Sequence, residues 1–467
     1  MKEKLAYLHT WGCQMNVHDS EKIAGVLKVE GYALTDMPEK ADLIILNTCS
    51  IREKAEQKFY SELGVLRAMK TKRPDMKIGI TGCIAQQEGP KLRKSNPHVD
   101  FAFGPQNITM LPDLLGGEKF QARVEENPSV HLTKLPAERQ DGLKAWINIM
   151  YGCNNFCSYC VVPFTRGRER SRPYADVIEE IEALPQSGYK EVTLLGQNVN
   201  SYNGNCTFPE LLAYINAIDG IERIRFVTSH PKDLGGDLIS AMKELDKVCE
   251  HIHLPLQSGS TDVLRRMNRK YTYEQYLDGI RQLREQVPGV AITSDIIAGF
   301  PGETDEDHEA TVSALREIEF DGIFAFKYSK RPYTKAKDLE GQVEEKVKSD
   351  RLNHLLKVQD TITERKNRSL EGQTVEVLIE GKTEDYHGAT ECCVTDGCVA
   401  DADPMTDPNK NRMTRYTGRT RTNKIVNFVY NGELRTGQLF DVIISRGFKH
   451  SLEGRGPDEV QCLYPGM

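Results

Sequence analysis

Apolar residues in the first 120 positions occur in short uninterrupted runs, separated by stretches in which they recur every three or four positions. The uninterrupted runs are typical of strands buried on both faces, and the periodic stretches are typical of amphipathic helices. The runs that predict strands are residues 5–10, 41–48, 77–82 and 99–104. We therefore expect residues 1–120 to form an α/β domain with a doubly wound parallel sheet.

A longer alternation follows a polar, proline-containing stretch at 118–143, which we interpret as a linker. Its apolar runs predict six further strands, at residues 145–150, 191–197, 224–229, 251–257, 291–299 and 322–329. Six strand–helix units indicate a partial (βα)6 barrel rather than the eight-unit form. A long charged helix ending at Gly372 leaves this domain, which we place at residues 143–372.

The pattern changes again after Gln373, where glycines bound short β-rich runs. These runs are residues 374–381, 424–430 and 440–447, and a polar insert at 382–418 separates the first from the second. They predict a small antiparallel β-barrel at 373–446.

Composition adds the cellular setting. The chain has 467 residues, 39% of them hydrophobic and 28% charged, which is ordinary for a soluble globular protein. No apolar run is long enough to span a membrane and no signal peptide is evident, so we expect a cytoplasmic protein. In that reducing compartment, twelve cysteines favour metal binding or redox chemistry over disulfides.

The most specific motif consists of Cys153, Cys157 and Cys160, which follow the first strand of the expected barrel. Barrel active sites lie on the loops after the strands. Three closely spaced thiolates can each bind one iron of a 4Fe–4S cluster and leave the fourth iron open for a ligand. Zinc is the less favoured alternative, because a structural zinc ion needs a fourth protein ligand and no other Cys or His is nearby.

A second cysteine trio is dispersed along the chain. Cys13, Cys49 and Cys83 each stand just beyond the end of one N-terminal strand. Ligands of open α/β sheets gather at that edge, so we expect the three thiols to converge and hold a second cluster. The alternative is that they are three buried apolar residues, since free cysteines are commonly buried.

The spacing of the barrel trio resembles the radical S-adenosylmethionine superfamily. Further sequence motifs resemble the methylthiotransferase family, in the branch that modifies isopentenyladenosine in tRNA. These motifs are GCQMN at 12–16, NTCSIREKA at 47–55, GCIAQ at 82–86, CNNFCSYCVVPFTRGRERSR at 153–172 and LLGQNVNSY at 194–202. The resemblance covers nearly the whole chain and implies a C-terminal RNA-binding barrel of the TRAM type.

This resemblance implies a tRNA methylthiotransferase that uses two 4Fe–4S clusters and two molecules of S-adenosylmethionine. One molecule methylates a sulfur at the cluster of the N-terminal trio. The other is cleaved at the barrel cluster to a radical that removes hydrogen from carbon 2 of the adenine, next to the anticodon. Expected partners are tRNA, a sulfur donor and a low-potential electron donor such as a flavodoxin or ferredoxin. Two alternatives stay open: a methylthiotransferase acting on a ribosomal-protein aspartate, and an RNA-binding electron-transfer protein.

The rim of the barrel offers residues for S-adenosylmethionine. We expect the backbone at 297–299 to lie beside the adenine of the cofactor, and the polar side chains at the ends of the strands to contact its ribose or methionine. The candidates are Gln197, Asn198, Gln257, Ser258, Ser294, Asp295, Ile297 and Gly299. Ordinary strand-to-helix turns and satisfied loop amides are the alternative interpretation.

Three basic groups predict an RNA path from the small barrel to the active-site mouth, although the net charge is −7. The first group is Lys410, Arg412, Arg415, Arg419, Arg421 and Lys424. The second is Arg166, Arg168, Arg170 and Arg172, and the third is Arg265, Arg266, Arg269 and Lys270. Solvated surface is the alternative for any one group.

Three details stand apart from the main pattern. Tyr333 replaces the glycine of the family's Arg-Pro-Gly-Thr word. His251 and His253 share one face of a strand, and we interpret them as barrel histidines. The insert holds Cys392, Cys393, Cys398 and His387. These four residues are a possible metal site, for which exposed thiols are the favoured alternative.

Overall fold

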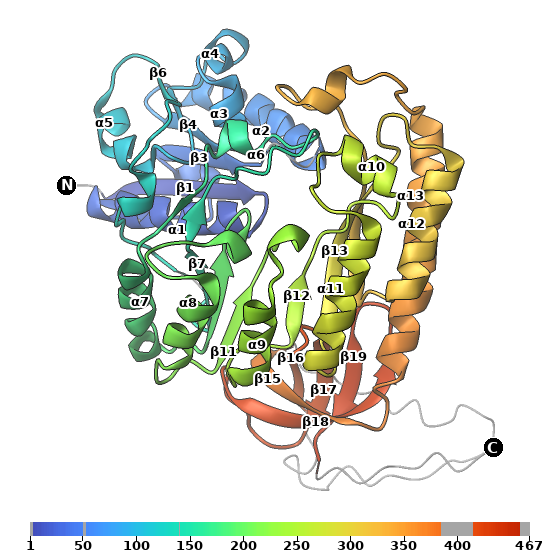
Figure 1. Cartoon of the computed structure of the whole chain (residues 1–467). Helices are drawn as coiled ribbons and strands as arrows, with labels where there is room; N and C mark the ends of the chain where they lie inside the picture. The colour runs from blue at the N-terminus through green and yellow to red at the C-terminus, as the bar shows by residue number, and fades with distance from the viewer. Residues whose placement is uncertain (1–2, 50–52, 140, 384–413, 458–467) are drawn as a thin grey trace, which may run out of the picture.

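The computed structural model describes residues 3–49, 53–139, 141–383 and 414–457. It has an N-terminal sheet layer, a central partial barrel and a small C-terminal barrel, one below the other in Figure 1. This arrangement confirms the α/β prediction. Cys392, Cys393, Cys398 and His387 lie outside the described residues.

The N-terminal sheet has the order β2-β1-β3-β4-β5-β6, and all its pairs are parallel. Its strands are β1 (Lys4–Trp11), β2 (Tyr32–Leu34), β3 (Leu43–Thr48), β4 (Lys77–Gly82), β5 (Phe101–Phe103) and β6 (Gln121–Arg123). Alternate residues of β3 enter two separate cores, Leu43 and Ile45 on one face and Ile44 and Leu46 on the other. Both faces are therefore covered, as the uninterrupted apolar run predicts.

Helices cover this sheet on both sides. They are α1 (Gln14–Val29), α2 (Glu53–Lys72), α3 (Cys83–Glu88), α4 (Lys91–Ser95) and α5 (Leu111–Gly116). The linker expected at 118–143 is wrong in part, because β6 extends the sheet as an edge strand; its short polar sequence carries no apolar run. The first turns of α1 bury the polar residues His18 and Asp19, so amphipathic periodicity did not reveal them.

Six parallel strands form the partial barrel, as predicted. They are β7 (Lys144–Asn148), β10 (Glu191–Leu195), β11 (Arg223–Phe226), β12 (His251–His253), β13 (Ala291–Ala298) and β14 (Gly322–Lys327). They pair as two three-stranded sheets, and a bridge between Ile224 and Val248 joins the halves. β7 and β14 stand at the two ends of this order.

Helices pack around the outside of the strands (Figure 1). They are α7 (Tyr174–Glu182), α8 (Phe208–Asn216), α9 (Gly236–Glu244), α10 (Thr261–Arg266), α11 (Tyr273–Gln286), α12 (Asp305–Ile318) and α13 (Glu345–Arg368). The loop after β7 carries β8 (Met150–Tyr151), the short helix α6 (Val162–Thr165) and β9 (Arg170–Ser171). None of the described helices has the length and apolar character that crossing a bilayer requires.

The C-terminal domain is a closed barrel of five strands in the order β15-β16-β17-β19-β18. The strands are β15 (Thr374–Lys382), β16 (Thr414–Thr420), β17 (Ile425–Tyr430), β18 (Leu439–Gly447) and β19 (Leu452–Arg455). Two of them lie outside the three predicted runs. β16 falls at the end of the expected polar insert, because only Tyr416, Gly418 and Thr420 turn inward and the residues between them are polar.

Two buried arginines of β11 fasten the C-terminal barrel to the amino-terminal ends of the core strands. Arg223 donates to the carbonyl oxygen of Arg419 (2.6 Å). Arg225 donates to the carbonyl oxygens of Thr420 (2.7 Å) and Arg421 (2.8 Å). The turn between β16 and β17 therefore lies beneath the core, at the end opposite the cysteine loop (Figure 1).

We expect Arg225→Met to loosen this junction. Arg225 Nε also pairs with Glu191 (2.9 Å), whose side chain is 2% exposed, so the variant leaves a buried carboxylate without its cation. Breaking a buried pair in this way costs about 3–5 kcal/mol. The thermal unfolding midpoint should fall, and proteases should release the C-terminal barrel earlier. Arg281→Met removes an arginine with a 65% exposed side chain and should change neither measurement noticeably.

Candidate active site

The N-terminal cysteines meet at one edge of the sheet. Cys13 caps α1 after β1, Cys49 follows β3, and Cys83 begins α3 after β4. Because these strands are parallel neighbours, their carboxyl ends lie together. The thiol of Cys49 forms hydrogen bonds with both Cys13 and Cys83.

These contacts divide the protons unequally among the three sulfurs. The hydrogen bond with Cys49 lowers the pKa of Cys13 to about 5 and that of Cys83 to about 7, and the Arg166 charge acts in the same direction. The same hydrogen bonds raise the pKa of Cys49. The thiolate, which is the form that binds metal, is therefore favoured at Cys13 and Cys83.

A buried polar network positions the strand ends. Asn16 donates from Nδ2 to Asn47 Oδ1 (3.0 Å), and Asn47 donates back to the carbonyl oxygen of Asn16 (2.8 Å). Gly82 has φ +87°, and a Cβ there would lie 2.4 Å from the carbonyl oxygen of Thr48. Only glycine therefore allows the backbone at position 82 to lie this close to the end of β3, just before Cys83.

The barrel trio of Cys153, Cys157 and Cys160 lies on the loop after β7, the first strand of the core. Two neighbouring segments hold this loop, because Ser158 donates its N–H to Met267 (3.0 Å) and accepts from the N–H of Ala336 (2.8 Å). Arg269 is 4% exposed and donates to Cys157 Sγ at 3.3 Å. Arg269 is therefore an internal partner of the cysteine loop, not a phosphate contact.

The number of sulfurs in each trio bears on the kind of metal centre. All six cysteines belong to the described residues and are free of disulfides. Each trio supplies three thiol ligands, one fewer than a structural zinc ion requires. A 4Fe–4S cluster bound through three of its irons fits this number and leaves the fourth iron open.

A buried ion pair joins the two trios. Arg166 follows α6, is 4% exposed, and contacts Asp19 of α1 at 2.8 Å. α6 lies directly after Cys160 and contacts α3, which begins at Cys83. The trios from the two domains therefore lie on elements that pack against each other. Burial of Arg166 tells against the phosphate contact expected from it.

The residues expected to bind S-adenosylmethionine fall into two groups. Asp295 and Ile297 lie on the half-exposed face of β13, and the amide of Gln197 is buried with no hydrogen-bond partner among the described residues. A buried amide without a protein partner is able to bind a polar group of a ligand at this rim. Gln257 is buried, with φ +73°, and its N–H donates to the carbonyl oxygen of Asp295 (2.8 Å).

The other group has structural partners. Asn198 donates to Asp233 (2.8 Å), and Ser294 accepts from the N–H of Leu256 (2.8 Å). Ser258 lies 3.3 Å from the hydroxyl of Thr311. A Cβ on Gly299 would meet Lys348 of α13 at 2.3 Å, so the packing of α13 accounts for this glycine. These contacts favour the alternative interpretation of ordinary loop residues.

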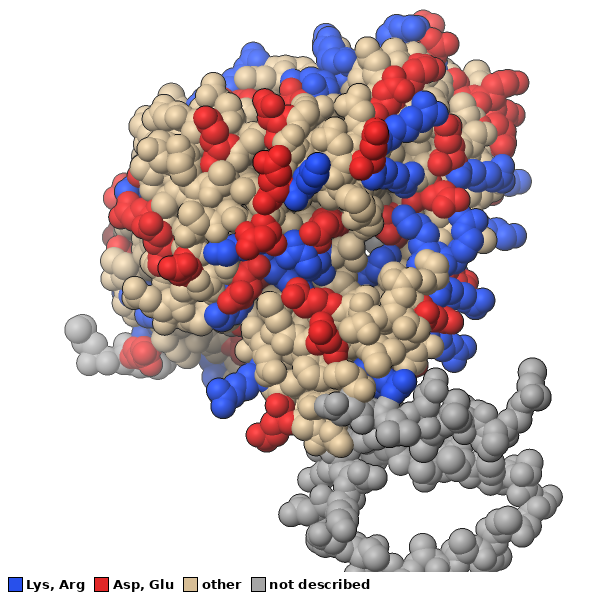
Figure 2. All heavy atoms as spheres, turned by 60° about the horizontal axis from the view of Figure 1, so that its bottom comes forward, with Lys and Arg blue, Asp and Glu red and all other residues tan. Residues whose placement is uncertain are grey.

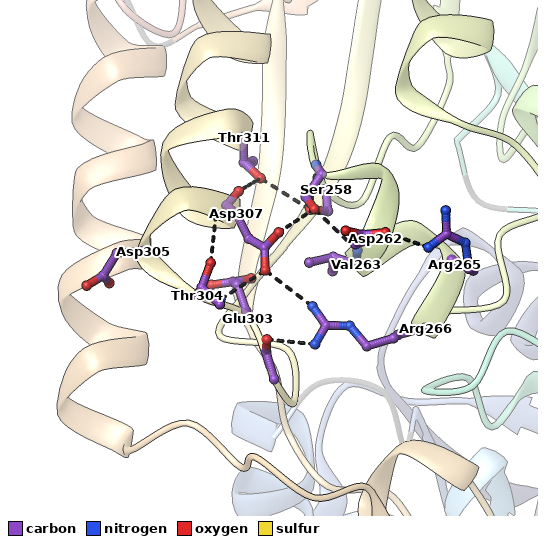
Figure 3. Close-up of polar contacts among 12 residues, drawn as sticks. Ser258, Asp262, Val263, Arg265, Arg266, Glu303, Thr304, Asp305, Asp307 and Thr311 are labelled. Atoms are coloured by element: carbon purple, nitrogen blue, oxygen red, sulfur yellow. Dashed lines mark hydrogen bonds and ion pairs between the residues drawn. The ribbon is translucent and has the colours of Figure 1, made fainter.

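A network around α12 ties two rim loops together (Figure 3). Asp307 accepts from the hydroxyl of Ser260 (2.5 Å) and from Arg266 (3.3 Å). Arg266 also donates to the carbonyl oxygen of Gly302 (2.6 Å). Arg266, which was expected on the RNA path, thus connects the loop at Gly302 with Asp307 of α12.

Several cations of the expected RNA path are engaged with carboxylates. Arg421 pairs with Glu250 (2.7 Å), Lys424 with Asp321 (3.2 Å) and Arg419 with Glu380 (3.0 Å). In Figure 2, basic and acidic side chains alternate over most of the face, and the basic ones gather along the edge on the side of α13. Arg168 is exposed and lies 4.3 Å from the ring of Phe156. Lys410 and Arg412 lie outside the described residues.

Sequence reasoning missed an aromatic wall inside the partial barrel. Ile323 and Ala325 of β14 pack in the core, so Phe324 and Phe326 face the other way; they are 55% and 44% exposed. In the strand register, Asp295 lies beside Phe324 and Ile297 beside Phe326. The signal was the repeat of phenylalanine two positions apart, hidden within an apolar run.

Two family models match this chain, one over each of the regions that carry a cysteine trio. Residues 5–104 match the Uncharacterized protein family UPF0004, and residues 147–315 match the Radical SAM superfamily. A tRNA-2-methylthio-N(6)-dimethylallyladenosine synthase from Thermodesulfovibrio yellowstonii is 51% identical over 97% of this chain and 99% of its own length. This chain belongs to the tRNA-2-methylthio-N(6)-dimethylallyladenosine synthase family. A Clostridium novyi relative of the same name is 47% identical over 97% of this chain and 96% of its own length.

Solved structures of lower identity share the fold of this radical SAM methylthiotransferase. TsrM, a radical S-adenosylmethionine methyltransferase from Kitasatospora setae, superposes with a TM-score of 0.54 at 15% identity. The match covers 72% of this chain and 75% of that chain. A second structure of TsrM, with cobalamin and a [4Fe-4S] cluster bound, gives a TM-score of 0.55 at 16% identity over 72% and 77% of the two chains.

We expect Gly82→Ala to disrupt the N-terminal cysteine edge. Its Cβ would collide with the carbonyl oxygen of Thr48, in addition to the strain of about 1–2 kcal/mol that alanine carries at positive φ. Gly31→Ala is the matched control, because Gly31 has φ +78° and open space around it. The thermal midpoint of the Gly82 variant should fall clearly further. Equal midpoints would show that the close approach at Gly82 is unimportant.

Proposed function

We propose that this chain attaches a methylthio group to carbon 2 of isopentenyladenosine, beside the anticodon of tRNA. One observation carries the proposal: two cysteine trios, from different domains, face one interface closed by the Arg166–Asp19 pair. Full-length relatives named for this reaction support the same substrate. Cytoplasmic location, a sulfur donor and a flavodoxin or ferredoxin as electron donor belong to the proposal.

In this proposal Cys153, Cys157 and Cys160 hold the 4Fe–4S cluster characteristic of the radical SAM superfamily. When bound, the cluster supplies the electron that cleaves S-adenosylmethionine. The protein's own contribution is orientation. Arg269 fixes Cys157 through its hydrogen bond to the sulfur. Gln197 offers its unpartnered amide to the polar end of the cofactor.

Cys13, Cys49 and Cys83 would hold a second 4Fe–4S cluster, where the sulfur to be transferred is kept. Convergence of the three thiols and the lowered pKa values of Cys13 and Cys83 support this assignment. The network of Asn16 and Asn47 keeps the strand ends in register. α1 and α3 then present the site to the core.

The target base would lie against the wall formed by Phe324 and Phe326. Aromatic rings offer stacking area for a purine and an apolar surface for its dimethylallyl group. His253 and Asp295 lie beside the wall, with Nε2 and Oδ2 3.5 Å apart, and supply polar groups for the base edge. This position is on the same face as Ile297, where the cofactor is expected.

Two cysteine variants separate the proposed roles. In Cys49→Ala the barrel trio is intact, so a strongly reduced protein should still release 5′-deoxyadenosine from S-adenosylmethionine, but methylthio product should disappear. Cys157→Ala should release no 5′-deoxyadenosine. Anaerobic assays would measure both compounds together. Methylthio product at the wild-type rate from Cys49→Ala would contradict the role of the N-terminal trio.

Iron content provides an independent check. Two 4Fe–4S clusters correspond to about eight irons per chain, and each triple Cys→Ala variant should retain about half. Cys206→Ala is the control, because Cys206 belongs to neither trio and should leave the iron content unchanged. An unchanged content after removal of Cys13, Cys49 and Cys83 would exclude the second cluster.

The RNA-binding cations are proposed with different roles. Arg168 is exposed beside the cysteine loop, so it is placed to contact phosphate. Arg419, Arg421 and Lys424 instead hold the C-terminal barrel against neighbouring carboxylates.

Salt dependence of tRNA binding distinguishes these roles. Arg168→Ala should reduce the log–log slope by roughly one, because one phosphate contact is lost. Arg421→Ala should lower the thermal midpoint and leave the slope unchanged, because its guanidinium is already paired with Glu250. A reduced salt-dependence slope in Arg421→Ala would show that this arginine contacts phosphate.

A further inference from the structure

Two aromatic side chains protrude together at the edge of the cysteine loop. Phe164 is 48% exposed and Tyr333 is 54% exposed, and their ring centroids are 5.9 Å apart with an interplanar angle of 31°. Large aromatic rings normally bury most of their area. This pair therefore offers an apolar surface that the fold itself does not cover.

The pair belongs to the mouth of the site. Phe164 lies in α6, four residues after Cys160. Tyr333 lies in the loop after β14, and Ala336 of that loop donates its N–H to Ser158 between two of the cysteines (2.8 Å). Anything bound on the pair would be next to the cysteine loop.

The backbone at Tyr333 is strained for a residue that carries a side chain. Tyr333 has φ +67°, a conformation that glycine adopts freely and that a tyrosine adopts only with strain. Strained residues of this kind concentrate at functional sites. The ring contacts Phe164 at the surface and is not enclosed by the core.

The loop that carries Tyr333 is basic on both sides of that residue. The loop supplies Lys330, Arg331, Lys335 and Lys337, and its first acidic residue is Asp338. Lys330 and Lys335 are exposed. Aromatic rings among cations are the usual composition of a surface that binds unpaired nucleotides, with stacking for the base and charge for the phosphate.

We propose that Phe164 and Tyr333 form a stacking platform for an unpaired base of the RNA substrate, next to the base that enters the barrel. The inference rests on the proposed function, because it requires RNA at this mouth. The neighbouring lysines would contact the phosphates on either side of the stacked base. The platform is distinct from the wall of Phe324 and Phe326, which faces the interior.

Tyr333→Gly tests the platform, because this variant removes the ring without destabilising the fold. Glycine relieves the backbone strain, so the thermal midpoint should stay the same or rise. Loss of one stacked base should weaken binding of tRNA carrying isopentenyladenosine on the order of ten-fold, with an unchanged salt slope because no phosphate contact is removed. Tyr333→Phe should bind as the wild type does.

Further variants complete the design. Phe164→Leu should weaken binding similarly, and the double variant should be less than additive because both rings support one base. Tyr214→Leu is the matched control: Tyr214 is 48% exposed and stacks with Tyr174 on the outer helices. Replacing Lys330 with Gln should flatten the salt slope by roughly one.

Three outcomes would overturn the inference. Wild-type affinity of Tyr333→Gly for tRNA would remove the platform, and unchanged RNA affinity with slower reduction by flavodoxin would identify a protein-docking surface instead. A large fall in the midpoint of Tyr333→Gly would show that the ring serves folding. Failure of the wild-type protein to bind or modify tRNA would count against the proposed function itself, independently of Tyr333.

Discussion

The arrangement of the molecule depends on the buried ion pair between Arg166 and Asp19. The pair spans the interface between the N-terminal domain and the core, and both side chains are 5% exposed. Charges so deeply buried are costly unless they remain together, so any separation of the domains would be opposed strongly. Glu180 reinforces the same interface by pairing with Arg172 (2.8 Å) and Lys22 (3.2 Å). The two cysteine trios are therefore held at a fixed separation.

Buried arginines serve the opposite end of the core in a related way. Arg223 and Arg225 act chiefly through backbone carbonyl oxygens of the β16–β17 turn. Carbonyl acceptors do not depend on which side chains the turn carries, whereas the upper interface depends on specific carboxylates. The core is thus a rigid centre with a domain fixed at each end. The rim loops of the core are connected to each other by the pair of Asp307 and Arg266.

The sequence was informative where chemistry is local and less so where it depends on distant partners. The spacing of Cys153, Cys157 and Cys160 was sufficient to predict the superfamily, and the positions of the apolar runs were sufficient to predict the fold class. The runs of arginine were misleading, because the sequence does not show whether a basic side chain contacts phosphate or a carboxylate of the protein. Arg421, for example, pairs with Glu250, which lies 171 positions away in the chain. β16 was missed because many of its residues are polar, and amphipathic periodicity did not reveal the buried polar residues His18 and Asp19 of α1. Phe324 and Phe326 were hidden in a run that looked fully buried.

The placement of the C-terminal barrel has a consequence for the size of the substrate. It sits at the amino-terminal ends of strands whose other ends carry the active site, and the eight-residue strand β13 alone spans about 26 Å. An RNA whose target base is in the mouth reaches the small barrel only through a part of the molecule at least that far from the base. A free nucleoside or a short RNA loop in the mouth is too small to reach the C-terminal barrel, whereas a full tRNA is large enough to span this distance.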